Sequence, residues 1–340
     1  MTKKEFNING EKLLLRAWNF KEDRTSSEQL LDLVFQKDLS QMGLAITSIF
    51  QEYEKMVPIM KVLSLIDSGF KHAFDGFVIE NSKKQIIAFL NVSYSTNNQY
   101  EISMVATHPD YRRKGLGKML IDEAINHVKN LNARICYLEV IDHNEPAYEL
   151  YKKQGFIHYE SVIRLKLTLK KQTQNPLDKI HIPNDYSLRG YKYSKKINES
   201  CYQLDLLTTP LLTQKFFPVQ RKKYHKPFFI LVIRPLVSLF IPKPPTYAIY
   251  YKTGNLVAKL TLFMSKKKDH PHSIDILMDP AHSQQLATAL VSFAINNIVE
   301  TKGSNVAIIE FRPSETHLLD VCRNLNFEEL EHMHKLGIKF

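Results

Sequence analysis

One pattern of residues occurs twice along this chain, at a constant spacing of 171 positions. Pro109 corresponds to Pro280 at this spacing, and Phe156 corresponds to Phe327. The same spacing also brings together four successive predicted elements of the two halves. Because unrelated segments do not keep one spacing through several elements, the sequence predicts two copies of one structural module.

Within the first copy, the periodicity of apolar residues predicts strands that alternate with helices. Strands are expected at 12–18, in a hairpin over 75–95, and at 100–107, 133–140 and 156–169. Helices are expected around 26–39, within 45–66, and over 116–131 and 144–154. Ser26 or Ser27 is the expected N-cap of the first helix, because a serine hydroxyl satisfies the free amides there.

The two copies define the expected domains. Residues 1–170 form the first domain, the polar stretch 171–184 forms a linker, and 185–340 form the second domain. A chain of 340 residues has room for two separate hydrophobic cores. Hydrophobic and charged contents of 44% and 24% are typical of a folded protein, which excludes a disordered or fibrous class.

The cysteines indicate a reducing compartment. Cys136, Cys201 and Cys322 lie far apart and form no closely spaced pair, so neither disulfides nor a zinc site is expected. The first ten residues are polar and lack the apolar core of an export signal. We therefore expect a cytoplasmic protein.

The positive charge is concentrated in the second half. Of the net charge of +11, +9 falls after residue 170, with a peak at 221–227. A basic surface favours anionic partners, although most charge runs are only solvated. The adjoining apolar run 228–242 is shorter than the ~20 residues that span a bilayer, so it is compatible with a peripheral membrane contact only. Nucleic acid is disfavoured as a partner.

A cation-rich glycine loop separates a predicted strand from a predicted helix at "HPDYRRKGLGKML", residues 108–120. The first amides of a helix lack intrahelical partners and point toward the positive end of the helix dipole. Gly115 and Gly117 let an anion approach the main chain, and neighbouring cations add charge. The loop is therefore a candidate diphosphate site, although glycines here are also compatible with a simple tight turn.

Two motifs resemble one known family. "RRKGLG" (112–117) is similar to the R/Q-x-x-G-x-G/A motif of GNAT N-acetyltransferases, and "NEPAYELYKKQGF" (144–156) is similar to their second signature. The resemblance covers about 13–169, and "LEVIDHNEPAYELY" is most similar to ribosomal-protein alanine N-acetyltransferases. It implies an α/β (α+β) fold: tandem GNAT folds, each a mixed, mostly antiparallel twisted sheet flanked by helices.

The resemblance also implies a role for individual residues, with acetyl-CoA as co-substrate and no metal. Val105, Ala106 and Thr107 would bind the pantetheine arm through their main chain. The pyrophosphate would lie against Arg112, Arg113, Lys114, Gly115, Leu116, Gly117 and Lys118. Asn144 would contact pantetheine or only cap its helix. Tyr151 would protonate the leaving thiolate, unless it only packs in the core.

Two carboxylates are candidates for the base that deprotonates the amine. Glu139 matches the base position of the ribosomal-protein subfamily, and Glu101 matches that of the histone-acetylating branch. A mechanism without a protein base remains the third alternative, because an ordered water chain can also remove the proton.

The second copy lacks the residues of the loop. At the spacing of 171, Arg112 is replaced by Ser283, Gly115 by Leu286 and Tyr151 by Cys322. We therefore expect a degenerate domain that does not bind acetyl-CoA and that shapes the substrate cleft or stands in for a dimer partner. The protein would be a monomer or a pseudo-dimer.

The sequence thus predicts an acyltransferase that moves an acetyl group from acetyl-CoA to a primary amine, on a small molecule or a peptide, by direct attack in a ternary complex. The alternative is a non-catalytic CoA-binding regulator or scaffold, with a basic C-terminal half that contacts lipid or nucleic acid.

Overall fold

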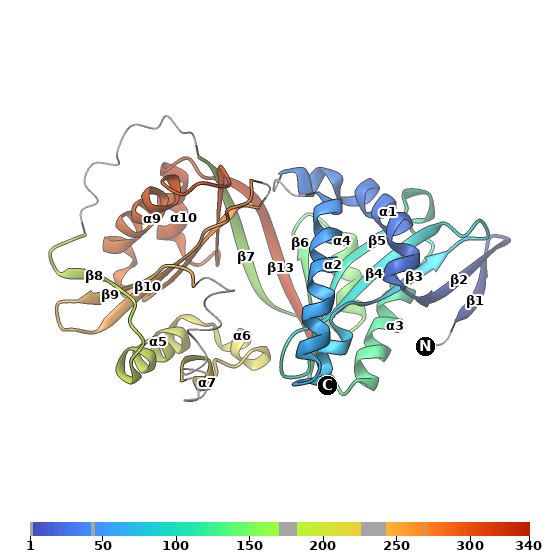
Figure 1. Cartoon of the computed structure of the whole chain (residues 1–340), viewed down its shortest axis with the longest axis horizontal. Coiled ribbons are helices and arrows are strands. Elements are labelled where there is room, and N and C mark those ends of the chain that lie inside the picture. Colours follow the sequence, from blue (N-terminus) through green and yellow to red (C-terminus); the bar gives the residue numbers. More distant parts are fainter. Residues whose placement is uncertain (1–2, 42–44, 170–181, 226–242, 269) are drawn as a thin grey trace. The chain divides into compact units, whose positions relative to one another are not determined.

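The computed structural model describes residues 3–41, 45–169, 182–225, 243–268 and 270–340. The chain forms two compact units (Figure 1). Unit 1 comprises Met1–Tyr159 and Met333–Phe340, and unit 2 comprises Glu160–His332. Within the described ranges, no helix is both long and apolar enough to cross a membrane. The apolar run 228–242 and most of the expected linker lie outside these ranges.

Unit 1 is a twisted sheet with helices on both faces. Its sheet has the order β1-β2-β3-β4-β5-β6-β13, in which only β5 and β6 are parallel. Its elements are β1 (Lys4–Ile8), β2 (Glu11–Ala17), α1 (Phe20–Gln41), α2 (Ile46–Leu63), η1 (Ser68–His72), β3 (Asp75–Glu80), β4 (Ile86–Tyr94), β5 (Gln99–Thr107), η2 (Pro109–Tyr111), α3 (Leu116–Asn130), β6 (Ile135–Ile141), α4 (Glu145–Lys153) and the end of β13 (Glu328–Lys339).

Unit 2 repeats this architecture. Its sheet has the order β7-β12-β11-β10-β9-β8, and only β11 and β12 are parallel. Its elements are β7 (Ile157–Thr168), which begins in unit 1, β8 (Tyr186–Gly190), α5 (Lys195–Thr208), α6 (Leu211–Phe216), α7 (Arg221–Tyr224), β9 (Thr246–Tyr251), β10 (Leu256–Phe263), β11 (His272–Met278), η3 (Pro280–His282), α9 (Ser283–Val299), β12 (Val306–Phe311) and α10 (Thr316–Asn324).

The structure confirms the internal repeat. Four pairs of elements have both their first and last residues 171 positions apart: β3 and β9, η2 and η3, α4 and α10, and β7 and β13. The predicted fold class, a tandem of mostly antiparallel sheets flanked by helices, is also confirmed.

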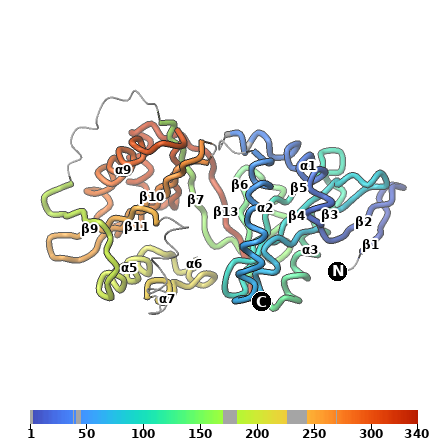
Figure 2. Tube along the Cα trace, viewed as in Figure 1, coloured from blue at the N-terminus to red at the C-terminus, as the bar shows by residue number. Residues whose placement is uncertain are grey.

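The last strands of the two copies are exchanged. Residues 333–339 of β13 pair antiparallel with β6, which belongs to the first copy (Figure 2). Residues 163–168 of β7 pair antiparallel with β12, which belongs to the second copy. Each copy therefore completes the sheet of the other, and the compact units differ from a simple division of the chain at residue 170.

Alternation along the strands of unit 1 fills two separate cores. Phe77 and Ile79 face the core beneath α3, whereas Val78 faces the core beneath α1 and α2, because successive side chains of a strand point to opposite faces. The predicted stripe of α3, from Leu116 to Val128, is buried in the first of these cores. The strands are thus fixed from both sides, which holds the ends of β5 and β6 in place.

Two local predictions near the N-terminus require correction. Helix α1 begins at Phe20, so Ser26 and Ser27 lie inside it and neither is its N-cap. The Ser27 hydroxyl instead accepts a hydrogen bond from the Trp18 indole at 3.0 Å. At the helix start, Asn19 Oδ1 accepts from the amide of Lys21 at 3.1 Å. Strand β1 was not predicted.

Candidate active site

The loop between β5 and α3 presents a row of free main-chain amides. Arg113 and Gly115 have positive φ angles of 59° and 80°. Among the described residues, the amides of Arg113, Lys114 and Gly115 have no acceptor, and the first intrahelical bond there runs from Met119 to Gly115 at 3.1 Å. Alternating right- and left-handed backbone makes a concave nest of N–H groups that binds anions. The loop therefore has the geometry of a phosphate site.

Exposed cations surround this loop. Arg112, Arg113 and Lys114 are exposed, and the Lys114 ammonium lies 4.6 Å from the centre of the Tyr111 ring. Lys118, in the first turn of α3, pairs with Asp122 at 2.6 Å. The charge around the free amides is therefore mainly positive, as a diphosphate requires.

The second motif lies against the first. A Cβ atom added to Gly117 would lie 3.6 Å from Leu150 Cδ2, so α4 packs on the first turn of α3. Asn144 caps α4, because its Oδ1 accepts from the Ala147 amide at 3.4 Å. Of the two alternatives for Asn144, the capping role is therefore observed, and a contact with pantetheine remains a prediction.

Tyr151 is a core residue of unit 1. It is 5% exposed and packs edge-on against Phe156, with ring centres 6.0 Å apart. Burial raises the pKa of Tyr151 to about 12. The phenol therefore keeps its proton at neutral pH and is able to donate it, so its core position does not exclude the predicted acid role.

Strands β5 and β6 diverge next to the glycine loop. Their parallel pairing runs from Gln99–Ile135 to Ile102–Leu138, and the registered pairs end there. The β4–β5 register shifts in the same region, and Met104 has a φ angle of 53°, which marks a β-bulge. Ala106 and Thr107 pair with β4 on one side, but among the described residues no strand pairs with the opposite edge of Val105, Ala106 and Thr107, the edge that faces β6.

The two candidate carboxylates flank the point of divergence. Glu101 lies on β5 and accepts a hydrogen bond from the Tyr137 hydroxyl at 3.3 Å. Glu139 lies one residue after the last registered pair and is 3.6 Å from the Lys335 ammonium. Burial, and secondarily the charge of Glu139, raise the pKa of Glu101 above its ordinary value. This raised pKa makes Glu101 a better proton acceptor than an ordinary carboxylate.

Sequence reasoning missed a polar network beside Glu101. The fully buried Asn91 accepts from the Ser103 hydroxyl at 3.2 Å and from the Tyr53 hydroxyl at 3.4 Å. Burial, and secondarily the charge of Glu101, raise the pKa of Tyr53 to about 12. The one detectable signal was Asn91 itself, a polar residue within the otherwise apolar run of β4.

Unit 2 has a different structure at the equivalent of the loop. Helix α9 begins at Ser283, which corresponds to Arg112, so it starts four residues earlier in the repeat than α3 does. Leu286, at the position of Gly115, lies inside this helix and is 0% exposed. Cys322, at the position of Tyr151, is also fully buried. An extra helical turn thus replaces the nest of amides.

Two cavities of about 460 and 570 Å³ occur in unit 2, and both are lined by Lys196, Ser200 and Gly254. The first is also lined by Arg189 and Tyr250, among others. Neither lining includes the strand divergence of unit 1 or the residues of unit 2 that correspond to the glycine loop. The candidate active site therefore remains the glycine loop and open strand edge of unit 1.

Comparison with known proteins identifies the family of the chain. Residues 45–156 match the model of the Acetyltransferase (GNAT) family. The chain is 30% identical over 134 residues to streptothricin acetyltransferase of Streptomyces lavendulae. The aligned region covers 36% of this chain and 68% of that protein.

Solved structures share the fold over nearly the whole chain. A GCN5-related N-acetyltransferase from Sphaerobacter thermophilus has a TM-score of 0.62 and 12% identity, covering 96% of this chain and 95% of its own. A tandem GNAT protein from the clavulanic acid biosynthesis pathway has a TM-score of 0.51 and 13% identity, covering 96% and 98%. At such identities these two similarities concern the fold alone.

The fold and the site together define an acyltransferase. Within that class, the chain belongs to the GNAT family of acetyltransferases, whose members transfer acetyl groups from acetyl-CoA.

Proposed function

We propose that unit 1 transfers the acetyl group of acetyl-CoA to a primary amine by direct attack in a ternary complex, and that unit 2 does not bind acetyl-CoA. The observation that carries this proposal is the nest of free amides at Arg113–Gly115, followed directly by α3 and placed next to an unpaired strand edge. A diphosphate and an extended amide-bearing chain are the two ligands that such neighbouring features accept.

The residues of unit 1 would divide the binding between them. The amides and cations of 112–118 would hold the pyrophosphate, with charge-assisted hydrogen bonds that contribute ~1.5–3 kcal/mol each. The main chain of Val105, Ala106 and Thr107 would pair with the pantetheine arm, as an added strand does. Asn144 would hold the amide-bearing arm while it caps α4.

Catalysis needs a base, an oxyanion donor and an acid. Glu101 would take the proton of the incoming ammonium, directly or through one water, because its raised pKa makes it a better proton acceptor than an ordinary carboxylate. A main-chain amide at the bulge after Met104 would stabilise the oxyanion. As the new C–N bond forms and the C–S bond breaks, Tyr151 would give its proton to the sulfur. The amine nitrogen would lose its second proton to water, which would return a proton to Tyr151. Glu139, paired with Lys335, would set the charge beside Glu101.

The acceptor would be a primary amine that approaches these carboxylates as a cation. The region that carries Tyr53, Asn91 and Ser103 would line its path, since this network adjoins Glu101. Lys335 would also line it, so one residue of the C-terminal half takes part in the site of unit 1. Because the chain is 30% identical over 134 residues to a streptothricin acetyltransferase, streptothricin is one amine to test, together with peptide N-termini.

Binding of acetyl-CoA to a matched pair of glycine variants tests the proposal. Gly115 and Gly254 have similar positive φ angles of 80° and 85°, and neither would meet another atom within 4 Å if a Cβ were added. Alanine at either position therefore introduces comparable backbone strain, of about 1–2 kcal/mol. Only Gly115 lies in the proposed pyrophosphate loop, whereas Gly254 lies in the β9–β10 turn.

Calorimetric titration of the full chain with acetyl-CoA should then separate the two variants. We expect Gly115→Ala to weaken binding at least about tenfold and Gly254→Ala to leave it unchanged. An unmodified chain that does not bind acetyl-CoA, or equal losses in both variants, would reject the proposed site. Release of free thiol with a panel of amines would then identify the acceptor.

A further inference from the structure

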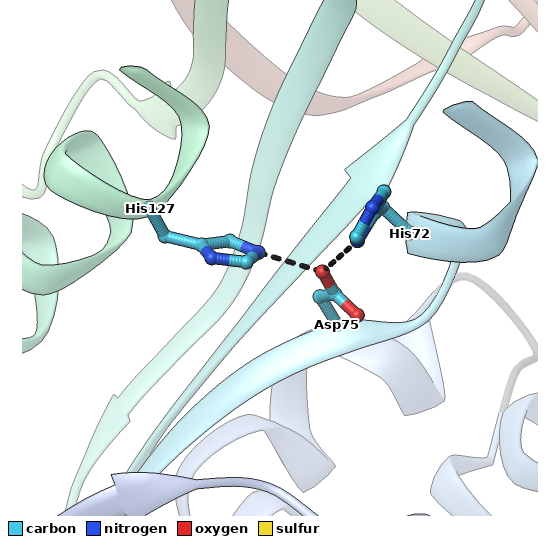
Figure 3. Close-up of side chains that lie close together, drawn as sticks. All are labelled: His72, Asp75 and His127. Atoms are coloured by element: carbon cyan, nitrogen blue, oxygen red, sulfur yellow. Dashed lines mark hydrogen bonds and ion pairs between the residues drawn. The ribbon is translucent and has the colours of Figure 1, made fainter. Parts of the chain in front are cut away.

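Three metal-ligating side chains of unit 1 meet away from the proposed active site. His72 ends η1, Asp75 begins β3, and His127 lies in the last turn of α3 (Figure 3). Asp75 Oδ2 lies 2.8 Å from His72 Nδ1 and 2.6 Å from His127 Nε2. All three ligand atoms lie within 4.8 Å of one another. Both imidazole rings therefore direct a nitrogen at the same carboxylate.

The burial of this cluster suits a bound ion. The side chains of His72, Asp75 and His127 are 29%, 17% and 11% exposed. Such a site is dry enough to strengthen binding and open enough to admit an ion with a water ligand. His127 is further fixed by Phe77, whose ring contacts it edge-on with centres 5.4 Å apart.

The charge of Asp75 is not balanced by a lysine or an arginine. Among the described residues, its carboxylate pairs only with the two histidines. A cation is therefore favoured at this position.

The second copy shows that the fold does not require these side chains. At the spacing of 171, His72 corresponds to Lys243, Asp75 to Thr246 and His127 to Ile298. Ile298 is fully buried in the core of unit 2. In unit 2 an apolar core residue thus takes the place of His127, so the three ligands occur in the first copy and not at the equivalent positions of the second.

We propose that His72, Asp75 and His127 form a binding site for a divalent transition-metal ion, with zinc the expected ion and water completing its coordination. Two imidazoles and one carboxylate favour zinc and its neighbours over magnesium or calcium, which prefer oxygen ligands. Tetrahedral zinc, with ligand bonds of about 2.0–2.1 Å, separates its ligand atoms by about 3.3–3.4 Å. The carboxylate would therefore withdraw from each nitrogen by roughly 0.5–0.8 Å. The two ring nitrogens, which lie within 4.8 Å of each other, would take the same separation of about 3.3–3.4 Å when the ion binds.

The bound ion would act as a clamp rather than in acetyl transfer. It would join the last turn of α3 to the start of β3, while the first turn of α3 belongs to the glycine loop. The sequence predicted no metal, both from the spacing of the cysteines and from the family resemblance, and the proposed site uses no cysteine.

Zinc binding by a tag-free, chelator-treated full chain tests this proposal. Competition with a zinc indicator should give one zinc per chain, and cobalt should give a visible absorption band typical of nitrogen and oxygen ligation. Asp75→Asn is the decisive variant, because an amide oxygen still accepts from both rings but carries no charge. We expect Asp75→Asn and His127→Gln to weaken binding at least about tenfold.

The controls separate a built site from non-specific binding. His317→Gln, an exposed histidine of unit 2, should leave the zinc affinity unchanged. His72→Gln, at the most exposed of the three positions, keeps the test valid if another variant fails to fold by circular dichroism. Absence of zinc binding, or binding that Asp75→Asn and His72→Gln leave unaltered, would overturn the proposal and leave a purely hydrogen-bonded cluster. Neither result depends on acetyl-CoA or on activity.

Discussion

The exchange of β7 and β13 predicts that a mutation in the last strand of one copy destabilises the unit built mainly from the other copy. Leu336 lies in β13 and Leu165 in β7, at equivalent positions of the repeat, and both are 0% exposed. Leu336 packs in the main core of unit 1, whereas Leu165 packs in that of unit 2. Leu336→Ala should therefore destabilise the unit built from the N-terminal half, and Leu165→Ala should destabilise the other.

The magnitude follows from the burial. Truncation of a fully buried leucine to alanine costs about 3 kcal/mol, within a range of about 2.7–5 kcal/mol, because transfer energy and a residual cavity both count. For a unit of this size that loss lowers the unfolding midpoint by roughly 6–12 °C. It also raises the population of the opened unit about a hundredfold, since each 1.4 kcal/mol changes an equilibrium tenfold.

Hydrogen exchange followed by mass spectrometry measures each unit separately within the full chain. In Leu336→Ala, peptides from β4 and α3 should exchange about a hundredfold faster, while peptides from β10 and α9 should stay as in the parent protein. Leu165→Ala, the matched control, should show the reverse pattern. Faster exchange of β10 and α9 in Leu336→Ala, with β4 unaffected, would refute the exchange of strands.

Two predictions concern the proposed chemistry. Glu101→Gln should reduce kcat by about 10²–10⁴-fold and abolish the acidic limb of the pH–rate profile. The acidic limb should lie above the ordinary carboxyl range, because the rate rises with pH as Glu101, whose pKa is raised, loses its proton. Glu139→Gln should move the acidic limb to lower pH, because it removes a negative charge near Glu101. An acidic limb that persists in Glu101→Gln would assign the base elsewhere. Tyr151→Phe should lower kcat roughly 10²-fold with little change in acetyl-CoA affinity. In the unmodified protein, no basic limb from the Tyr151 phenol should appear in pH–rate profiles measured up to pH 10, because burial raises the pKa of Tyr151 to about 12.

Much of the fold of each copy could be predicted from the sequence, because apolar periodicity and the repeat report burial directly. The stripe of α3 and the hairpin of β3 and β4 are examples. Strand exchange could not be predicted in this way. β7 buries Val162 and Leu165, and β13 buries Met333 and Leu336 at the equivalent positions of the repeat. Such a pattern shows which face of a strand is buried but not which neighbour the strand pairs with.

The N-terminal errors have different physical origins. The β1–β2 hairpin turns at Asn9 and Gly10, with φ angles of 50° and 85°, and this Asn-Gly pair was a usable turn signal. The start of α1 was misplaced because serine hydroxyls also form tertiary hydrogen bonds, as Ser27 does with Trp18. Preference for a cap is a local property, and here a tertiary contact overrides it.

Within the candidate site, sequence identified the groups but not their environments. Glu101 and Glu139 were both recognised as candidates, and their order of preference depended on burial, which neither spacing nor composition reports. The partners Tyr137 and Lys335 come from β6 and β13, so they became visible only once these strands were paired. In the second copy, the sequence showed that the glycines of the loop are missing, but it did not show that α9 begins one turn earlier in the repeat than α3.

The place of β13 also has a consequence for how the protein is made. Chains emerge from the ribosome N-terminus first, and domains usually fold as they emerge. Here β6 pairs with β5 on one side, but its other neighbouring strand is present only after residues 333–339 have been synthesised. A frameshift or premature stop before residue 333 would therefore remove a strand from the half translated first, and cutting the coding region between the two copies would not yield two self-sufficient proteins.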